Sequence, residues 1–257
     1  MILTRPLHSP EFYQAHGLGV ETHITRYDIL PNWPQYIPFT YGVHLPYAGM
    51  NLAALDDELR QQSLAKLESA FDEALRYPVD RMVMHSIGIE REQDEIVGSY
   101  DRMISALQSF ADYAARQKII LCIENQLMPR PERRAIFGCT AKTWLQIHKD
   151  VARDNVMLTL DSSHASTSVA IFDSYEERIT RLYDYLAQPE LIGRIHWSDS
   201  RLKNQEALYH DMHLVPGKGD LPRDFHRKIK ALDVIKLLEQ KCSEEEVLEG
   251  LKFIETL

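Results

Sequence analysis

Short apolar runs recur along the chain and predict eight buried strands. Several of them, such as Ile-Ile-Leu-Cys-Ile over 119–123 and Val-Met-Leu-Thr-Leu over 156–160, are almost continuously apolar. This pattern is typical of parallel strands that are covered by helices. The predicted strands are residues 1–4, 18–23, 41–45, 81–85, 119–124, 156–161, 194–197 and 234–239.

Between these runs, apolar residues return at the three- and four-residue spacing of amphipathic helices. Segment 56–76 carries one such stripe at Leu64, Leu67, Phe71 and Leu75, and segment 92–117 carries another. Thr140 is a candidate N-cap for a helix that runs through Val151. Ser243 and Glu246 have the spacing of a capping box before a last helix.

Strands that alternate with helices predict an α/β fold, and eight such units predict a single (β/α)8 barrel over residues 1–257. The first third is short for this plan, since only about 20 residues separate the second strand from the third. That connection contains Pro31, Pro34 and Pro38, which favour an irregular crossing over a helix. We therefore expect a complete barrel with a reduced first or second helix.

A metal-binding type of side chain stands at the end of six predicted strands, at intervals of about 40 residues. These residues are His44, His85, Glu124, Asp161, His196 and Glu239. In a barrel, the C-terminal strand ends meet at one face, where active sites are built. Buried carboxylates without partners are costly, and a cation at this face would stabilise them. The pattern predicts a metalloenzyme.

Three more residues enlarge the candidate set. His164 follows Asp161 in a D-x-x-H spacing, and Asp211 with His213 forms D-x-H after the strand that ends near His196. Imidazole and carboxylate ligands suit zinc, manganese or iron(II). Nine ligands exceed the need of one ion, so we expect up to three divalent ions, with zinc favoured.

The bulk properties narrow the choice of partners. The net charge of −9 argues against broad, nonspecific nucleic-acid binding. The sequence contains no apolar segment long enough to predict a signal peptide or a membrane span. The spacing of the three cysteines is not that of a metal site. We expect a cytoplasmic protein with reduced thiols, no membrane association and no stable protein partner. His8, His16, His148 and His226 lie away from strand ends and are expected at the surface.

The segments HLPYAGMNL (44–52), MVMH (82–85), CIEN (122–125), LDSSHA (160–165), IHWSD (195–199), DMHLVPGKGD (211–220) and LLE (237–239) resemble the xylose-isomerase-like TIM-barrel superfamily. Within it they are most similar to the endonuclease IV branch, AP endonuclease family 2. The resemblance runs from about residue 18 to residue 257.

This resemblance implies three metal sites that share ligands. His44, His85 and Glu124 would form the first, and Glu124, Asp161, His196 and Glu239 the second. His164, Asp211 and His213 would form the third. The bound cations would activate water for attack on phosphorus, with Glu124 and Glu239 as the catalytic carboxylates.

The substrate contacts expected from the resemblance and from the charges near the site are fewer. Tyr47 matches a tyrosine that contacts DNA in the family. Arg130, Arg133 and Arg134 follow the fifth strand and are candidate phosphate clamps, and Lys218 lies in the VPGKG loop. Abasic DNA, a smaller phosphoester and a sugar are the candidate substrates.

Two functions remain open at this point. The first is an endonuclease IV-like phosphodiester hydrolase with a multinuclear metal site. The second is a sugar or sugar-phosphate isomerase or epimerase, in which one ion sits between Glu124, Asp161, His196 and Glu239. There the two glutamates would exchange protons with the carbon next to a carbonyl, and His164 would contact the substrate. A scaffold barrel without activity would be expected to lose ligands, and here none is lost.

Overall fold

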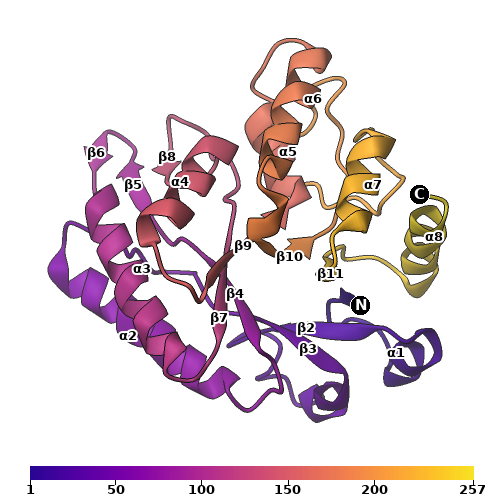
Figure 1. The fold of residues 1–257 in the computed structure, drawn as a ribbon, viewed down its shortest axis with the longest axis horizontal. Helices are drawn as coiled ribbons and strands as arrows, with labels where there is room; N and C mark the ends of the chain where they lie inside the picture. Colours follow the sequence, from indigo (N-terminus) through magenta and orange to yellow (C-terminus); the bar gives the residue numbers. More distant parts are fainter.

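In the computed structural model, which describes residues 1–257, eight parallel strands close into a barrel (Figure 1). Around the barrel the order is β1-β11-β10-β9-β7-β4-β3-β2. The strands are β1 (Ile2–Thr4), β2 (Gly19–His23), β3 (Thr40–His44), β4 (Arg81–His85), β7 (Ile120–Glu124), β9 (Val156–Asp161), β10 (Ile192–His196) and β11 (Ile235–Leu238). All eight correspond to predicted strands, and the predicted α/β barrel is confirmed.

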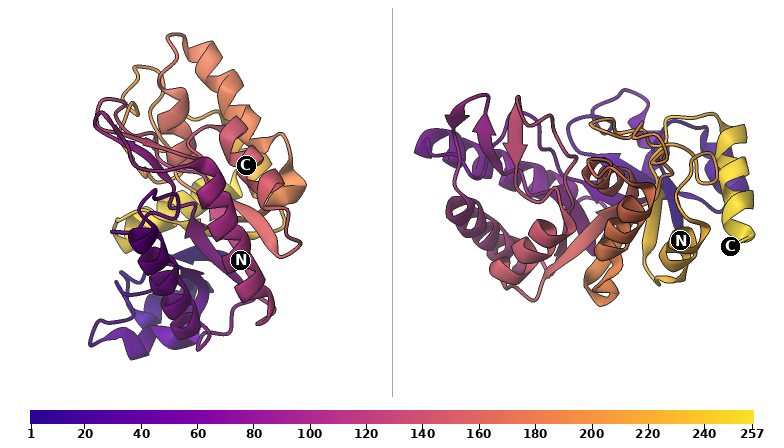
Figure 2. Two further views of the ribbon diagram at one scale, coloured as in Figure 1. Left: turned by 90° about the vertical axis from the view of Figure 1, so that its left-hand side faces the viewer. Right: turned by 90° about the horizontal axis from the view of Figure 1, so that it is seen from above.

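Helices surround the barrel, as the periodic segments predict (Figure 2). They are α1 (Pro10–His16), α2 (Asp57–Ala74), α3 (Tyr100–Ala115), α4 (Ala141–Val151), α5 (Ser162–Val169), α6 (Tyr175–Tyr183), α7 (Arg223–Ala231) and α8 (Glu244–Glu255). Short 3-10 helices are η1 (Trp33–Phe39), η2 (Asp184–Leu186) and η3 (Pro189–Leu191). The capping boxes at Thr140 and Ser243 open α4 and α8. None of the helices combines the length and the apolar character that a membrane span requires.

Strand register brings the candidate ligands to one end of the barrel. His85 on β4 lies beside Glu124 on β7, and Asp161 on β9 lies beside His196 on β10. His44 on β3 pairs with His23 on β2 in the same way. Because the strands are parallel, their C-terminal ends form a single face. The register therefore gathers side chains that are far apart in the sequence.

The connection between β2 and β3 contains η1 in place of an outer helix. Its proline-rich sequence cannot form a regular α-helix, because Pro38 lacks the backbone N–H that such a helix needs. Trp33 and Tyr36 turn inward and are buried, so this segment covers the barrel with two aromatic side chains. The reduced helix expected from the sequence is confirmed here.

The segment 92–117 is not helical throughout, which corrects the sequence-based expectation. Its first part forms β5 (Ile89–Glu92) and β6 (Glu95–Ile96), and α3 starts only at Tyr100. These strands pair with β8 (Arg134–Ile136) in an antiparallel accessory sheet, beside the barrel (Figure 1). Gln93 makes the turn at φ 51° and its N–H donates to the carbonyl of Arg133 at 2.8 Å. The partner strand lies about 40 residues later, so local periodicity does not reveal it.

Trp144 fixes α4 to the strand that carries Glu124. Its side chain is fully buried, and its indole N–H donates to the carbonyl of Ile123 at 2.9 Å. Tyr185 packs on the same ring with centroids 5.8 Å apart. The peptide next to Glu124 is thus held from behind by a helix side chain.

Trp144→Ala is expected to lower the free energy of unfolding by about 3–5 kcal/mol, because it leaves a large cavity and removes the hydrogen bond from the indole to Ile123. Lys142→Ala, an exposed change on the same helix, is expected to change it by less than about 0.5 kcal/mol. Guanidinium unfolding followed by circular dichroism measures both. Equal stability of the two variants would contradict this account of the core.

Candidate metal centre

The nine candidate ligands form one connected cluster at the C-terminal end of the barrel. Three groups of side chains have ligand atoms within 4.8 Å of one another: His44, His85 and Glu124; Glu124, Asp161, His196 and Glu239; and Asp161, His164 and His213. Asp211 adjoins the third group. The first two groups match the sets expected from the sequence, and the third differs by one residue.

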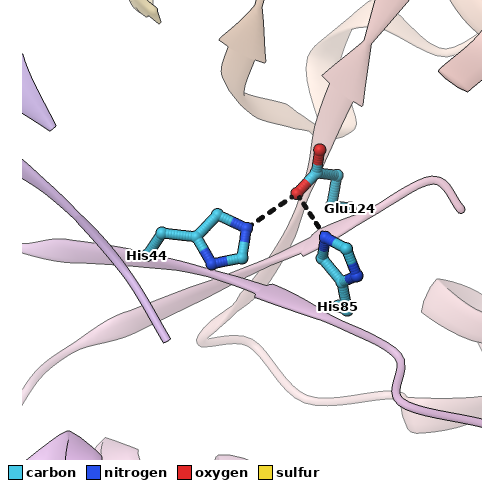
Figure 3. Close-up of side chains that lie close together, drawn as sticks. All are labelled: His44, His85 and Glu124. Atoms are coloured by element: carbon cyan, nitrogen blue, oxygen red, sulfur yellow. Dashed lines mark hydrogen bonds and ion pairs between the residues drawn. The ribbon is translucent and has the colours of Figure 1, made fainter. Parts of the chain in front are cut away.

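Glu124 lies at the middle of the cluster and faces two groups at once. Its Oε2 is 3.0 Å from His44 Nε2 and 3.2 Å from His85 Nε2 (Figure 3). Its Oε1 is 3.1 Å from His196 Nδ1 on the other side. One carboxylate oxygen is therefore directed to each group, which is the arrangement of a bridging ligand between two cations.

The second group contains oxygen atoms that lack partners. Asp161 Oδ2 and Glu239 Oε2 are buried and accept no hydrogen bond. Glu239 Oε2 is 3.2 Å from His196 Nδ1, but the geometry of that contact is not that of a hydrogen bond. Buried carboxylate oxygens in this state are costly without a cation. These two atoms and Glu124 fit the ligand set of a divalent ion.

The third group includes Asp161 in addition to the expected residues. Asp161, His164 and His213 offer ligand atoms to a common point. Asp211 Oδ2 instead lies 2.6 Å from His213 Nε2 and 3.6 Å from His164 Nε2. In this arrangement Asp211 pairs with the two imidazoles, and a cation between them would take its oxygen as a ligand.

Backbone carbonyls orient two of the histidines. His44 Nδ1 is 2.7 Å from the carbonyl of Leu45, and His164 Nδ1 is 2.8 Å from the carbonyl of Asn125. A carbonyl accepts only from a protonated nitrogen, so each contact places the proton on Nδ1. The Nε2 atom then carries a free lone pair that can bind a cation. In both residues this Nε2 points into the cluster.

Burial and crowded charge shift the pKa values of the cluster. Burial raises the pKa of Asp161 to about 7, and the nearby carboxylates of Glu239 and Glu124 act in the same direction. Burial also acts to raise the pKa of Glu124, but His196 and His85 outweigh it and hold that pKa well below its usual value. Such opposed, strongly shifted groups are typical of functional sites.

Two residues beside the centre come from the region of the first two strands. The guanidinium of Arg5, directly after β1, donates to Glu239 Oε1. Glu21 on β2 places Oε1 3.0 Å from His196 Nε2. Arg5 was not among the predicted site residues, although it comes directly after a predicted strand. His23 stacks on His44 with ring centroids 4.7 Å apart.

The cavity at the cluster has a volume of about 80 Å³ and is lined mostly by charged and polar groups. Among the lining residues are Arg5, Arg26 and Tyr27, from the N-terminal part of the chain. Tyr47, an expected substrate contact, stacks on His85 with centroids 4.1 Å apart and lines the same cavity.

The other expected substrate contacts are placed differently. Arg134 lines an adjoining cavity and pairs with Glu92 at 2.5 Å. The guanidinium of Arg130 lies over the ring of Tyr209, and Arg133 is exposed beside the accessory sheet. Lys218 pairs with Glu249 of α8 at 2.6 Å and does not line the cavity, and its role in substrate binding stays a prediction.

Two histidines expected at the surface are buried, which corrects that expectation. His226 on α7 accepts from the indole N–H of Trp197 at 2.9 Å, and His8 packs against Phe12 with ring centroids 5.1 Å apart. Both serve in packing between elements, which strand-end position does not reveal. His16 is exposed, as expected, and His148 is half-buried with Nε2 3.1 Å from the carbonyl of Val156.

Several solved structures share the fold of this chain, and they include both epimerase-like proteins and an endonuclease. A D-tagatose 3-epimerase-like protein has a TM-score of 0.70 and 18% identity, covering 93% of this chain and 87% of its own. Endonuclease IV from Thermus thermophilus has a TM-score of 0.66 and 18% identity, covering 99% and 97%. Another protein of that organism, soaked with zinc chloride, has a TM-score of 0.69 and 20% identity, covering 99% and 96%. At these identities the likeness is one of fold.

Sequence comparison adds a curated relative and a family. An uncharacterized protein of Methanocaldococcus jannaschii, MJ1311, is 26% identical over 127 residues, which are 49% of this chain and 42% of the relative. The chain thus matches less than half of that relative's length. The family model described as xylose isomerase-like TIM barrel matches residues 36–257, which include every candidate ligand. The chain therefore belongs to the xylose isomerase-like TIM barrel family.

Proposed function

We propose that this protein is a divalent-metal-dependent phosphodiester hydrolase with a multinuclear site. The observation that carries the proposal is the position of Glu124, whose two oxygens face two separate sets of histidines. A single ion is satisfied by about four ligands. The pair His44 and His85 lies on the far side of Glu124 from His196, so it supports a second ion next to the first.

The donor set fits such ions. Histidine nitrogens and carboxylate oxygens are ligands for zinc, with manganese and iron(II) as alternatives. The partnerless oxygens of Asp161 and Glu239 support a cation in the second group. The paired Asp211 and His213, with His164, support a cation in the third group. We therefore propose a complement of up to three ions.

The chain's residues and the bound ions would divide the chemistry between them. When bound, the ions polarise phosphoryl oxygens and lower the pKa of water, so that water attacks phosphorus near neutral pH. Glu124 sets the separation of the first two groups. The guanidinium groups of Arg5 and Arg26, which line the cavity, offer positive charge to the phosphate. No protein nucleophile is needed for this reaction.

The environment of Glu239 favours hydrolysis over proton exchange at carbon. Burial raises its pKa, but His196 and His213, and then Arg5, outweigh this effect and hold the pKa well below its usual value. Arg5 also occupies Oε1, which leaves Oε2 for a cation. Glu239 is better suited to ligation than to abstraction of a proton from carbon.

The substrate class that we propose is a phosphodiester, with abasic DNA and small diesters as its two candidate forms. The solved structure of endonuclease IV shares the fold, and Tyr47 stands at the mouth beside His85. The net charge of −9 weakens the attraction of duplex DNA to the protein as a whole. At the cavity itself, Arg5 and Arg26 stand beside four carboxylates, so bound cations would supply most of the positive charge that a phosphate needs.

A sugar isomerase or epimerase is the second candidate, and one observation favours it. Glu124, Asp161, His196 and Glu239 form a four-ligand group that would hold one ion without the other residues. Solved neighbours with this fold include D-psicose 3-epimerase in the presence of D-fructose, with a TM-score of 0.68. In this alternative the two glutamates exchange protons with the substrate, and His164 contacts it.

Metal content distinguishes the two candidates. Protein purified without chelator is expected to contain about three ions per chain, since three ligand groups are present. His85→Ala is expected to lose about one of them, and the exposed His16→Ala is expected to lose none. Elemental mass spectrometry on native protein gives the counts. A single ion that survives His85→Ala would reject the hydrolase.

The role of Asp211 is tested by activity. Asp211→Ala is expected to lower phosphodiester hydrolysis by at least about 100-fold, because His164 and His213 of the third group lose the carboxylate that lies against both of them. Initial rates on abasic oligonucleotides and on bis(p-nitrophenyl) phosphate measure the loss. The exposed Asp94→Ala serves as the control and should retain the wild-type rate. Epimerisation of ketoses by the wild-type protein, without diester hydrolysis, would establish the alternative function.

The Arg5–Glu239 pair predicts a pH dependence of metal retention. Arg5 lowers the pKa of Glu239, so Arg5→Met raises it, and protons then displace the cation from Glu239 at a higher pH. The midpoint of metal release on acidification is expected to move up, while Arg5→Lys restores part of the shift. Metal content after dialysis across a pH series measures the midpoint. An unchanged midpoint in Arg5→Met would show that the pair does not tune the ligand.

A further inference from the structure

A second cavity adjoins the candidate metal centre on the side of the accessory sheet. Its volume is about 220 Å³, and it shares Tyr47, His85, His164 and Asp211 with the centre. A group held at His164 and Asp211 therefore reaches directly into it. The two cavities differ in chemistry, because the rest of this second wall is mainly apolar: Met50, Ile87, Ile89, Leu127 and Ile136.

The accessory sheet supplies the outer part of this apolar wall. Ile89 on β5 pairs with Ile136 on β8 in the antiparallel register. The side-chain amide of Asn51 holds β5 in place, since its oxygen accepts from the N–H of Ile89 at 2.9 Å and its nitrogen donates to the carbonyl of Ile89 at 3.0 Å. The wall is thus tied to the barrel through the loop that also carries Tyr47.

Ile87 shows how tightly this wall is positioned. Its φ of 51° lies in the left-handed region, which β-branched residues rarely adopt. The N–H of Leu52 donates to its carbonyl at 2.8 Å and holds this conformation. The result is a buried isoleucine whose side chain lines the cavity beside the metal centre. A site of this kind is preformed and does not depend on a ligand to order it.

Tyr47 separates the polar cavity from the apolar one. Its ring lies parallel to that of His85, with an interplanar angle of 6°, and it borders both cavities. An apolar cavity of about 150 Å³ is large enough to admit a benzene ring. The apolar cavity beside Tyr47 is larger, so a planar ring fits it, and the apolar lining favours such a ring over a hydroxylated sugar.

We propose that this apolar cavity binds a planar ring, a nucleobase or an aryl group, attached to the phosphoryl group that the candidate metal centre holds. The phosphoryl part rests on the proposed function, whereas the ring-binding part rests on the cavity alone. Arg134 is the charged residue that the accessory sheet adds to this cavity, and its guanidinium is paired with Glu92. The preferred substrates are then diesters that carry a base or an aryl ring next to the scissile phosphorus.

Two ligands with one anchor test the ring-binding part without any chemical turnover. Phenylphosphonate and methylphosphonate share the phosphonate group, and neither is hydrolysed at its P–C bond. Titration calorimetry with zinc-reconstituted protein is expected to give at least about tenfold tighter binding of phenylphosphonate, the gain typical of an apolar group in a fitted pocket. Methylphosphonate affinity reports whether the metal centre is intact in each variant.

Three variants locate the ring. Ile136→Ser makes the wall polar, Leu127→Trp fills the cavity, and both are expected to bring the affinity ratio close to one. Ile96→Ser is the matched control, because Ile96 lies in the same accessory sheet, is 69% exposed and does not line the cavity. It is expected to keep the wild-type ratio and the wild-type methylphosphonate affinity.

The outcomes separate this inference from the proposed function. A wild-type ratio near one, no binding of either phosphonate, or a ratio that Ile136→Ser and Leu127→Trp both leave unchanged would overturn the inference. Diester hydrolysis is measured on the same preparations. Hydrolysis without a ring preference rejects the apolar site alone, whereas a ring preference without hydrolysis supports the site and rejects the proposed reaction.

Discussion

The contacts of one buried carboxylate organise this end of the molecule. Glu124 is at hydrogen-bond distance from His44, His85 and His196, which come from three different strands. These contacts require the strands to end at the same level, and the parallel register provides that level. The arrangement concentrates charge in a region that burial would otherwise make costly. A cation on each side of Glu124 would offset this cost, so the residue that contacts histidines of three strands would also be a ligand of both metal sites.

The sequence predicts the strands and most of the cluster because both follow simple physical rules. A buried strand must be apolar, and a polar side chain at its end, such as Asp161, must have a partner. The same rule applies to Arg5, which comes one residue after the first predicted strand and pairs with Glu239. The rules fail where a contact is not local. The hairpin of β5 and β6 depends on pairing with Arg134–Ile136, which lies far away in the sequence. The apolar periodicity of α3, which begins at Tyr100, led to the prediction of a helix that starts too early.

Side-chain roles are less predictable than positions, as one lysine and one aspartate show. Lys218 belongs to a motif that resembles a substrate loop, but in the structure it forms an ion pair with Glu249 on the last helix. Asp161 belongs to one expected group and in space also joins another. Both outcomes depend on distances between elements that are set by packing. Sequence spacing gives the order in which ligands arrive at the barrel face, but not which neighbours share them.

The closure of the barrel has a consequence for the order of folding. β1 pairs with both β2 and β11, and the Arg5–Glu239 contact joins residues that are 234 positions apart. During synthesis, β1 can pair with β2 early, but it can pair with β11 only after the last strand has been made. Until then, Glu124 and His44 have partners, whereas Arg5 lacks its carboxylate. The nascent chain can thus assemble the His44, His85 and Glu124 group early, and the second group is completed only when Glu239 has left the ribosome.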